Sequence, residues 1–132
     1  MEQHPEARLR WHHLPLPTHE PQASALASLA ECAGASGGHA AFWQAVGWIY
    51  AHTRGNGQGL PDGTQPPGLD AAPCLASGQP QATVREQAQG AARDGITATP
   101  ILRLHDERSG QALLLPGPVE GDALLSALDL LA

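Results

Sequence analysis

The sequence predicts a small α/β protein, because several segments with helical periodicity are followed by two short apolar segments that flank a turn. The 132 residues suffice for one hydrophobic core without disulfides or structural metals. Aromatic residues make up only 4% of the chain, so Ala and Leu must supply most of that core. We therefore expect a single domain over residues 1–132, with a polar and flexible stretch at 1–7.

The N-terminal part is expected to form a strand followed by a helix. Residues 8–14 alternate loosely between apolar and polar and can form a strand that Pro15 ends. Pro21 fits the first turn of a helix. After Pro21, small apolar residues recur at helical spacing as far as Gly34, where the helix is expected to end.

A second helix, after a break at Gly37 and Gly38, is expected to lie at the centre of the core. It holds most of the aromatic side chains of the chain. Its apolar positions follow the spacing i, i+4, i+7 and i+8, and they are Phe42, Val46, Ile49 and Tyr50. Residues 55–68 have no periodicity and are rich in Gly and Pro, so they are expected to form a surface loop, either a tolerated insertion or a functional segment.

The C-terminal half is expected to contain two helices, a β-hairpin and a closing helix. A short helix is expected at 69–76 and a longer one at 81–94, followed by a Gly that stops it. Segments 100–105 and 112–115 flank a turn and read as the two strands of a hairpin. The final helix has a strong apolar stripe, made of Leu124, Leu125, Leu128 and Leu131.

Charge and hydropathy exclude two classes of partner. The formal charge is −6, and the seven basic residues are scattered, which argues against nucleic acid. No apolar stretch approaches the length of a membrane span, which argues against insertion into a membrane. No secretory signal is visible, so we expect a cytoplasmic protein with Cys32 and Cys74 as reduced thiols, although their pairing stays open. A trimmed mature form would instead be periplasmic.

Several motifs together resemble a known family. Residues 95–102 (GITATPIL), followed by a hairpin and a helix, resemble the second half of thioredoxin-like domains, where a cis Thr-Pro bond opens the strand that faces the active site. Upstream, residues 14–19, 30–33 and 38–43 resemble the helical insertion of the DsbA-like branch, and 74–78 resembles the segment before its next helix. The resemblance implies a truncated thioredoxin-like fold with a DsbA-type helical insertion.

The chain departs from this family at the catalytic dithiol. The family carries a Cys-x-x-Cys turn at the start of a helix, where the helix dipole lowers the pKa of the first thiol. No Cys-x-x-Cys occurs here, and the strand-helix unit that would carry it is expected to be missing. That loss would leave a gap in the sheet. The strand at 8–14 could shift to close this gap, a second copy of the chain could cover it, or another protein could supply the missing strand-helix unit. We favour the second possibility and expect a homo-oligomer.

The resemblance also indicates where a partner would bind. In the family, the residue before the cis-Pro offers its backbone to an extended substrate, so Thr99 and Pro100 are the candidate peptide-binding residues. Cys74, near a possible helix start, is a candidate for a catalytic thiol, although a structural cysteine is the favoured interpretation. Cys32 lies on the apolar stripe of its helix and is expected to be buried and inert.

A metal site is the weakest candidate. His12, His13 and His19 form the tightest group of imidazoles, but neighbours on a strand point to opposite faces. Surface histidines are the favoured interpretation, and no cofactor is expected. The sequence therefore predicts a non-catalytic binding or self-assembling module. The alternative is a thiol–disulfide oxidoreductase that uses one cysteine or a dithiol site supplied by a partner.

Overall fold

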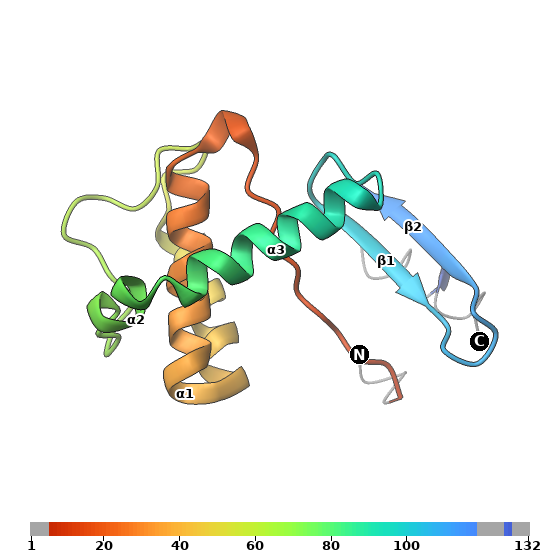
Figure 1. The fold of residues 1–132 in the computed structure, drawn as a ribbon, viewed down its shortest axis with the longest axis horizontal. Coiled ribbons are helices and arrows are strands. Elements are labelled where there is room, and N and C mark those ends of the chain that lie inside the picture. Colours follow the sequence, from red (N-terminus) through yellow and green to blue (C-terminus); the bar gives the residue numbers. More distant parts are fainter. Residues whose placement is uncertain (1–5, 119–125, 128–132) are drawn as a thin grey trace. The chain divides into compact units, whose positions relative to one another are not determined.

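The structure is a computed structural model that describes residues 6–118 and 126–127 (Figure 1). The chain divides into two compact units, the first over residues 1–91 and the second over residues 92–132. The described elements are η1 (Pro17–His19), α1 (Gln22–His52), α2 (Ala72–Ser77), α3 (Gln79–Arg93), β1 (Ile101–His105) and β2 (Ala112–Pro116). None of the described helices has the length and hydropathy needed to cross a membrane.

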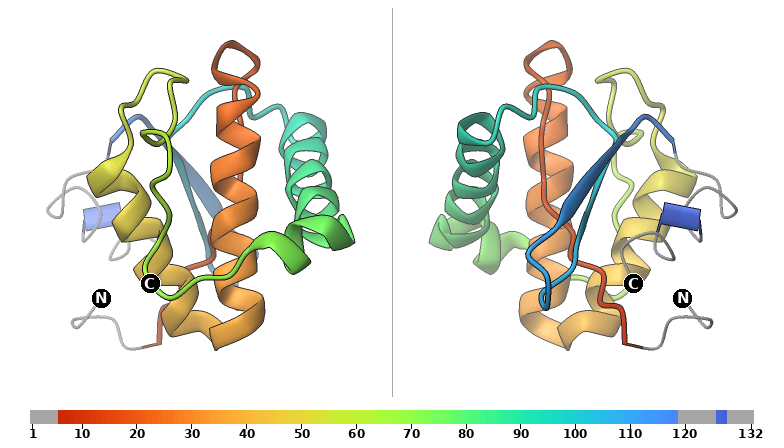
Figure 2. Two further views of the ribbon diagram at one scale, coloured as in Figure 1. Left: turned by 90° about the vertical axis from the view of Figure 1, so that its left-hand side faces the viewer. Right: turned by 90° about the vertical axis from the view of Figure 1, so that its right-hand side faces the viewer.

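Helix α1 is bent sharply and its two halves lie side by side (Figure 2). The bend is at Gly38, whose φ of 80° and ψ of −166° are not helical, and this confirms the predicted break. The predicted end at Gly34 was wrong, because the first half continues past it. A Cβ built on Gly34 would lie 3.3 Å from the Cβ of Phe42, so the missing side chain lets the two halves approach closely.

The core of the first unit lies between these halves. Ala30, Val46 and Ile49 are buried together, and partly buried apolar side chains pack around them. Tyr50, predicted to lie in the core, is instead 68% exposed. The reason is helical geometry: residue 50 lies two turns from Trp43 and shares the outer face of α1 with it.

Residues 8–14 do not form the predicted strand. The described part of this unit contains no strand with which they could form a ladder. The backbone N–H of His13 donates instead to Oε1 of Gln87 on α3, at 2.8 Å. The segment is thus extended chain held by side chains, because alternation alone cannot make a strand without a neighbour.

The loop, α2 and α3 agree with the sequence-based expectations. Residues 55–68 contain no helix or strand, and the Arg54 guanidinium donates to the carbonyl oxygens of Gln58 and Leu60 in this loop. Helix α2 ends at Gly78, which has a φ of 76°, and α3 follows immediately. Glycine adopts this left-handed conformation readily, which makes it a common residue at the end of a helix.

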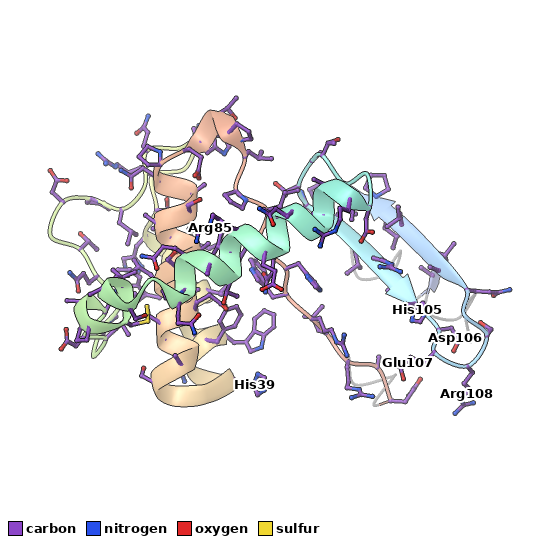
Figure 3. All side chains as sticks on the ribbon, in the orientation of Figure 1. His39, Arg85, His105, Asp106, Glu107 and Arg108 are labelled. Carbon is purple, nitrogen blue, oxygen red and sulfur yellow. A yellow bond between two sulfur atoms is a disulfide. The ribbon has the colours of Figure 1, made fainter. Side chains whose placement is uncertain are left out.

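The second unit contains an antiparallel hairpin, as predicted. Its register pairs Ile101 with Pro116 and His105 with Ala112. Asp106 organises the turn, since its carboxylate accepts from the Arg108 backbone N–H at 3.0 Å and from the Ser109 hydroxyl at 2.8 Å, which lowers the pKa of Asp106. His105, Asp106, Glu107 and Arg108 lie at this end of the hairpin (Figure 3). Of the predicted closing helix only 126–127 are described, and both are helical; its four leucines lie outside the described residues.

Candidate functional site

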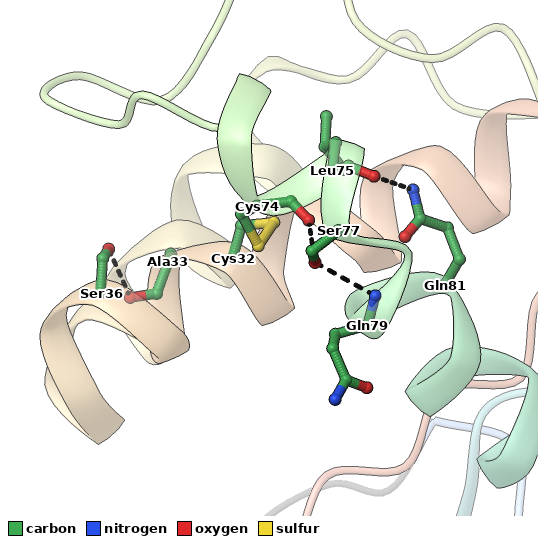
Figure 4. The surroundings of a disulfide bond; sticks show 8 residues. All are labelled: Cys32, Ala33, Ser36, Cys74, Leu75, Ser77, Gln79 and Gln81. Carbon is green, nitrogen blue, oxygen red and sulfur yellow. Dashed lines mark hydrogen bonds between the residues drawn. A yellow bond between two sulfur atoms is a disulfide. The ribbon is translucent and has the colours of Figure 1, made fainter.

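Cys32 and Cys74 form a disulfide that joins α1 to α2 (Figure 4). Their Cα atoms are 5.8 Å apart, within the usual range for this bond, and neither cysteine is free. The expectation of two reduced thiols was therefore wrong. A separation of 42 residues gave no sign of the pairing, because proximity here depends on where α2 packs against α1.

Side-chain hydrogen bonds fix the chain that follows Cys74 (Figure 4). The Ser77 hydroxyl donates to the Cys74 carbonyl oxygen at 2.6 Å and accepts from the backbone N–H of Gln79 at 3.2 Å. The Gln81 side-chain amide donates to the Leu75 carbonyl oxygen at 3.1 Å. These bonds satisfy backbone groups at the junction of α2 and α3, so the disulfide is attached to a defined turn.

The two cysteines differ in their access to solvent. Cys32 is only 1% exposed, whereas Cys74 is half-buried. Cys74 is therefore the more accessible of the two residues to an attacking thiolate. The structure agrees with the prediction that Cys32 is buried, but its sulfur is bonded rather than free.

A buried hydroxyl lies one turn before Cys32 on α1. Ser28 is 2% exposed, and among the described residues its Oγ has no hydrogen-bond partner. Leaving a hydroxyl unpaired in the interior costs free energy. The sequence pattern of this helix did not predict that Ser28 would be buried. Ser28 lies on the same helical face as the small alanines, and a serine fits the space that an alanine would fill.

His13 is buried, which corrects the expectation that the histidines of this segment lie on the surface. It is 6% exposed, and its ring contacts three side chains. Nδ1 accepts from the indole N–H of Trp11 at 3.1 Å, and Nε2 lies 3.2 Å from Oε2 of Glu31. Burial lowers the pKa of His13, against a smaller opposing effect from the hydrogen bond and charge of Glu31.

The histidines are not gathered into a metal site in the part of the chain that the structure describes. His12 is exposed and His19 is half-buried, and no cluster of three potential ligands occurs among the described residues. His13 uses both ring nitrogens in contacts with protein side chains. Sequence reasoning missed the partners Trp11, Glu31 and Gln87, because nothing in the spacing of these residues brings them together.

Thr99 and Pro100 lie in the second unit, immediately before β1. Both are exposed and the peptide bond between them is cis. The Pro100 carbonyl oxygen accepts from the backbone N–H of Gly117 at 2.9 Å, which extends the hairpin pairing by one bond. In the described residues β1 pairs with β2 alone, so the edge of β1 away from β2 has no strand beside it.

A helical segment closed by a disulfide, followed by a Thr-Pro turn and a hairpin, defines a thioredoxin-like α/β protein with a helical insertion. No family model matches the chain, and no curated protein matches it. Among solved structures, Pseudomonas aeruginosa DsbA2 matches with a TM-score of 0.88 and 41% sequence identity. The match covers 99% of this chain and 75% of that one. The chain therefore belongs to the DsbA family of thiol–disulfide oxidoreductases, as the resemblance implied.

Proposed function

We propose that this chain is a non-catalytic member of the DsbA family that binds extended polypeptides. The observation that carries the proposal is the disulfide, because it uses the only two sulfur atoms of cysteine in the 132 residues. The two cysteines are 42 residues apart and join two helices, unlike the adjacent pair of a Cys-x-x-Cys turn, and Cys32 is 1% exposed to an attacking thiolate. The Cys32–Cys74 bond then acts as a covalent link between α1 and α2.

Polypeptide binding is assigned to the edge of β1 that begins at Thr99 and Pro100. Alternate backbone N–H and C=O groups of a hairpin strand point away from its partner, and an extended peptide can pair with them. The exposure of Thr99 and Pro100 supports this mode of binding. A second copy of the chain could cover the same edge, and we propose self-association there in the absence of peptide. A monomer in sedimentation at micromolar concentration would contradict the self-association.

We further propose that the protein works in an oxidising compartment such as the bacterial periplasm. Disulfides persist there and are rare in the cytosol. The bond between Cys32 and Cys74 supports this location over the cytoplasmic one suggested by the sequence.

The alternative function is thiol–disulfide exchange through Cys74. The half-burial of Cys74 favours it, since a substrate thiolate could attack that sulfur and release Cys32 as a thiolate. A second substrate thiolate would then break the mixed disulfide. The substrate leaves as a disulfide, and this chain gains two electrons and two protons as a dithiol.

Reduction of insulin by dithiothreitol distinguishes the two functions. We expect no acceleration above the uncatalysed rate. Catalysis that disappears in Cys74→Ser and persists in Cys32→Ser would establish the alternative. Serine is the matched replacement at both positions because it removes only the sulfur chemistry.

The binding surface is tested with a fluorescent, carboxymethylated insulin B chain as an unfolded ligand. Thr99→Pro removes the backbone N–H that strand addition would use, so it should weaken binding about tenfold. Thr97→Pro, two residues earlier, is the matched control and should bind as the parent chain does. Equal binding by both variants would place the polypeptide site elsewhere.

A further inference from the structure

The disulfide is the strongest tie between α1 and residues 61–78, which we call the tethered segment. In the part of the chain that the structure describes, no hydrogen bond joins this segment to α1. Its backbone hydrogen bonds are local, such as the one from the Leu69 N–H to the Pro66 carbonyl oxygen at 3.3 Å. Its bonds with other elements lead to the start of α3, through Gln79 and Gln81. The segment is therefore attached to α1 by one covalent bond and by packing.

Few side chains of the tethered segment are buried. Pro66 and Ala71 are buried, and no residue of α2 itself is. Leu75, the large apolar side chain of α2, is half-buried. Buried apolar area supplies most of the energy that holds an element in place, and segments with little of it open locally before the rest of a protein unfolds. The covalent bond thus carries much of what keeps this segment on α1.

One polar atom at the junction of α2 and α3 is left without a partner while the segment is closed (Figure 4). The Gln81 side-chain nitrogen donates to the Leu75 carbonyl oxygen at 3.1 Å. Oε1 of the same amide is buried and, among the described residues, has no hydrogen-bond partner. Burial of an unpaired oxygen costs free energy. Release of α2 gives water access to this amide, so opening removes that cost.

Both ends of the tethered segment are defined without the disulfide. Before it, the Arg54 backbone N–H and the Thr53 hydroxyl donate to the Gly59 carbonyl oxygen, at 2.9 Å and 3.3 Å. After it, Gly78 ends α2 in the left-handed conformation, and α3 begins at the next residue. An opening confined to the segment therefore requires neither α1 nor α3 to unfold.

We propose that the Cys32–Cys74 bond is a redox switch: reduction by a dithiol releases the tethered segment from α1 while α1 and α3 stay folded. The switch is closed in the oxidising compartment proposed above and opens where a dithiol reductant reaches Cys74. The inference goes beyond the proposed function, because it involves neither polypeptide binding at Thr99 and Pro100 nor turnover of a substrate.

The chemistry of the switch is ordinary thiol–disulfide exchange. A thiolate of the reductant attacks at Cys74, the more accessible cysteine, and displaces Cys32 as a thiolate, which takes up a proton. The second thiolate of the reductant then attacks its own sulfur in the mixed disulfide and releases Cys74 as the second thiol. The reductant leaves as an internal disulfide, having lost two electrons and two protons, and this chain gains them.

The experiment measures how fast iodoacetamide alkylates each cysteine after the native chain is reduced with dithiothreitol and desalted. Tryptic peptides 11–54 and 55–85 carry one cysteine each, so mass spectrometry reads the two sites separately. We expect reduction to proceed without urea, and Cys32 to react within about tenfold of the rate of Cys74. Cys32 is 1% exposed and its sulfur lies against α2, so its alkylation reports release of the segment.

A single thiol elsewhere on α1 is the control for unfolding of the whole unit. It is Ala45→Cys in a chain that also carries Cys32→Ala and Cys74→Ala, because Ala45 lies on α1 and is 5% exposed. This thiol should react at least about a hundredfold more slowly than Cys32. The rate at Cys32 is also measured in up to about 1 M urea, where it should change little, because only global unfolding exposes enough surface to depend steeply on urea.

Three results would overturn the proposal. The bond could resist dithiothreitol until urea unfolds the chain. Cys74 could react while Cys32 stays protected by about a hundredfold or more, which would show that α2 stays packed on α1 without the bond. Cys32 could react at a rate that rises steeply with urea and equals that of the Ala45→Cys control, which would mean that reduction unfolds the whole unit. None of these measurements depends on insulin reduction or on peptide binding, so the proposed function is tested separately.

Discussion

The indole N–H of Trp11 donates a 3.1 Å hydrogen bond to Nδ1 of His13. An indole nitrogen can only donate, so Nδ1 carries no proton. The proton of the neutral ring is then on Nε2, which donates to Glu31 at 3.2 Å. A second proton on His13 would have to occupy the position that Trp11 uses, and the cationic ring could not keep this bond.

Stability should therefore fall as the pH drops below about 6.5. Burial lowers the pKa of folded His13 from 6.5, so the unfolded chain binds this proton more readily. The contribution of neutral His13 to the free energy of unfolding is complete above pH 6.5. It is lost as the pH falls toward the lower pKa that His13 has in the folded chain. One group can contribute a slope of at most about 1.4 kcal/mol per pH unit. Urea unfolding between pH 8 and pH 5 measures this dependence.

His13→Gln provides the comparison, because glutamine does not titrate. The variant should be less stable at neutral pH, with a flatter pH dependence between about pH 6.5 and 5. His39→Gln is the matched control: this histidine is exposed and is not among the groups that shift the pKa of His13, so its loss should leave the slope as in the parent chain. Equal slopes in all three proteins would show that His13 does not couple folding to pH.

The elements that the sequence predicted well are those specified by neighbouring residues. The turn at 106–110 is built by Asp106, whose carboxylate accepts from residues two and three positions further along. The bend at Gly38 needs a backbone conformation that glycine adopts readily, and α3 ends in a Gly-containing turn. Each of these features is encoded within a few residues, so periodicity and turn composition suffice to find it.

The features that the sequence did not predict depend on distant residues. His13 donates its backbone N–H to Gln87, which is 74 positions away, and this bond replaces the strand pairing expected for its segment. Cys32 forms a disulfide with Cys74 only because α2 packs against α1. A local motif was enough to propose Thr99 and Pro100, whose role stays a prediction, whereas no local motif announces the disulfide.

Removal of the disulfide should lower the free energy of unfolding by about 4 kcal/mol. The bond closes a loop of 42 residues, and cross-linking such a loop reduces the entropy of the unfolded chain by this order. The measurement compares urea unfolding of the parent chain with that of the Cys32→Ala, Cys74→Ala double variant. Dithiothreitol should destabilise the parent and leave the double variant unchanged. A double variant as stable as the oxidised parent would show that the link contributes nothing to folding.

Ser28→Ala should stabilise the protein by about 1 kcal/mol. The hydroxyl of Ser28 is buried without a described partner, and replacing it with hydrogen removes an unpaired polar group while keeping the methyl-sized volume. Alanine also has the higher helix propensity. Ser36→Ala is the control, since that hydroxyl is exposed and donates to the Ala33 carbonyl oxygen at 3.3 Å. A loss of stability in Ser28→Ala alone would indicate that an internal water satisfies the hydroxyl.

Two exposed glycines of α1 should respond to alanine in opposite directions. Gly38 has a φ of 80° and a ψ of −166°, whereas Gly47 has ordinary helical geometry. An alanine Cβ would have no neighbour within 4 Å at either position, so steric contact does not distinguish them. The backbone at Gly38 lies in a region that is essentially restricted to glycine, and Gly38→Ala should cost about 1–3 kcal/mol.

Gly47→Ala should instead stabilise the protein by about 0.5–1 kcal/mol, because alanine loses less backbone entropy when it enters a helix. Urea unfolding of the two variants under the same conditions measures both effects. The bend also brings Gly34 against Phe42, so strain at Gly38 should loosen the packing between the two halves of α1. Near-ultraviolet circular dichroism should then change in Gly38→Ala and stay constant in Gly47→Ala. Two stabilised variants would mean that the chain at residue 38 can continue as a straight helix, and that the fold does not depend on the bend.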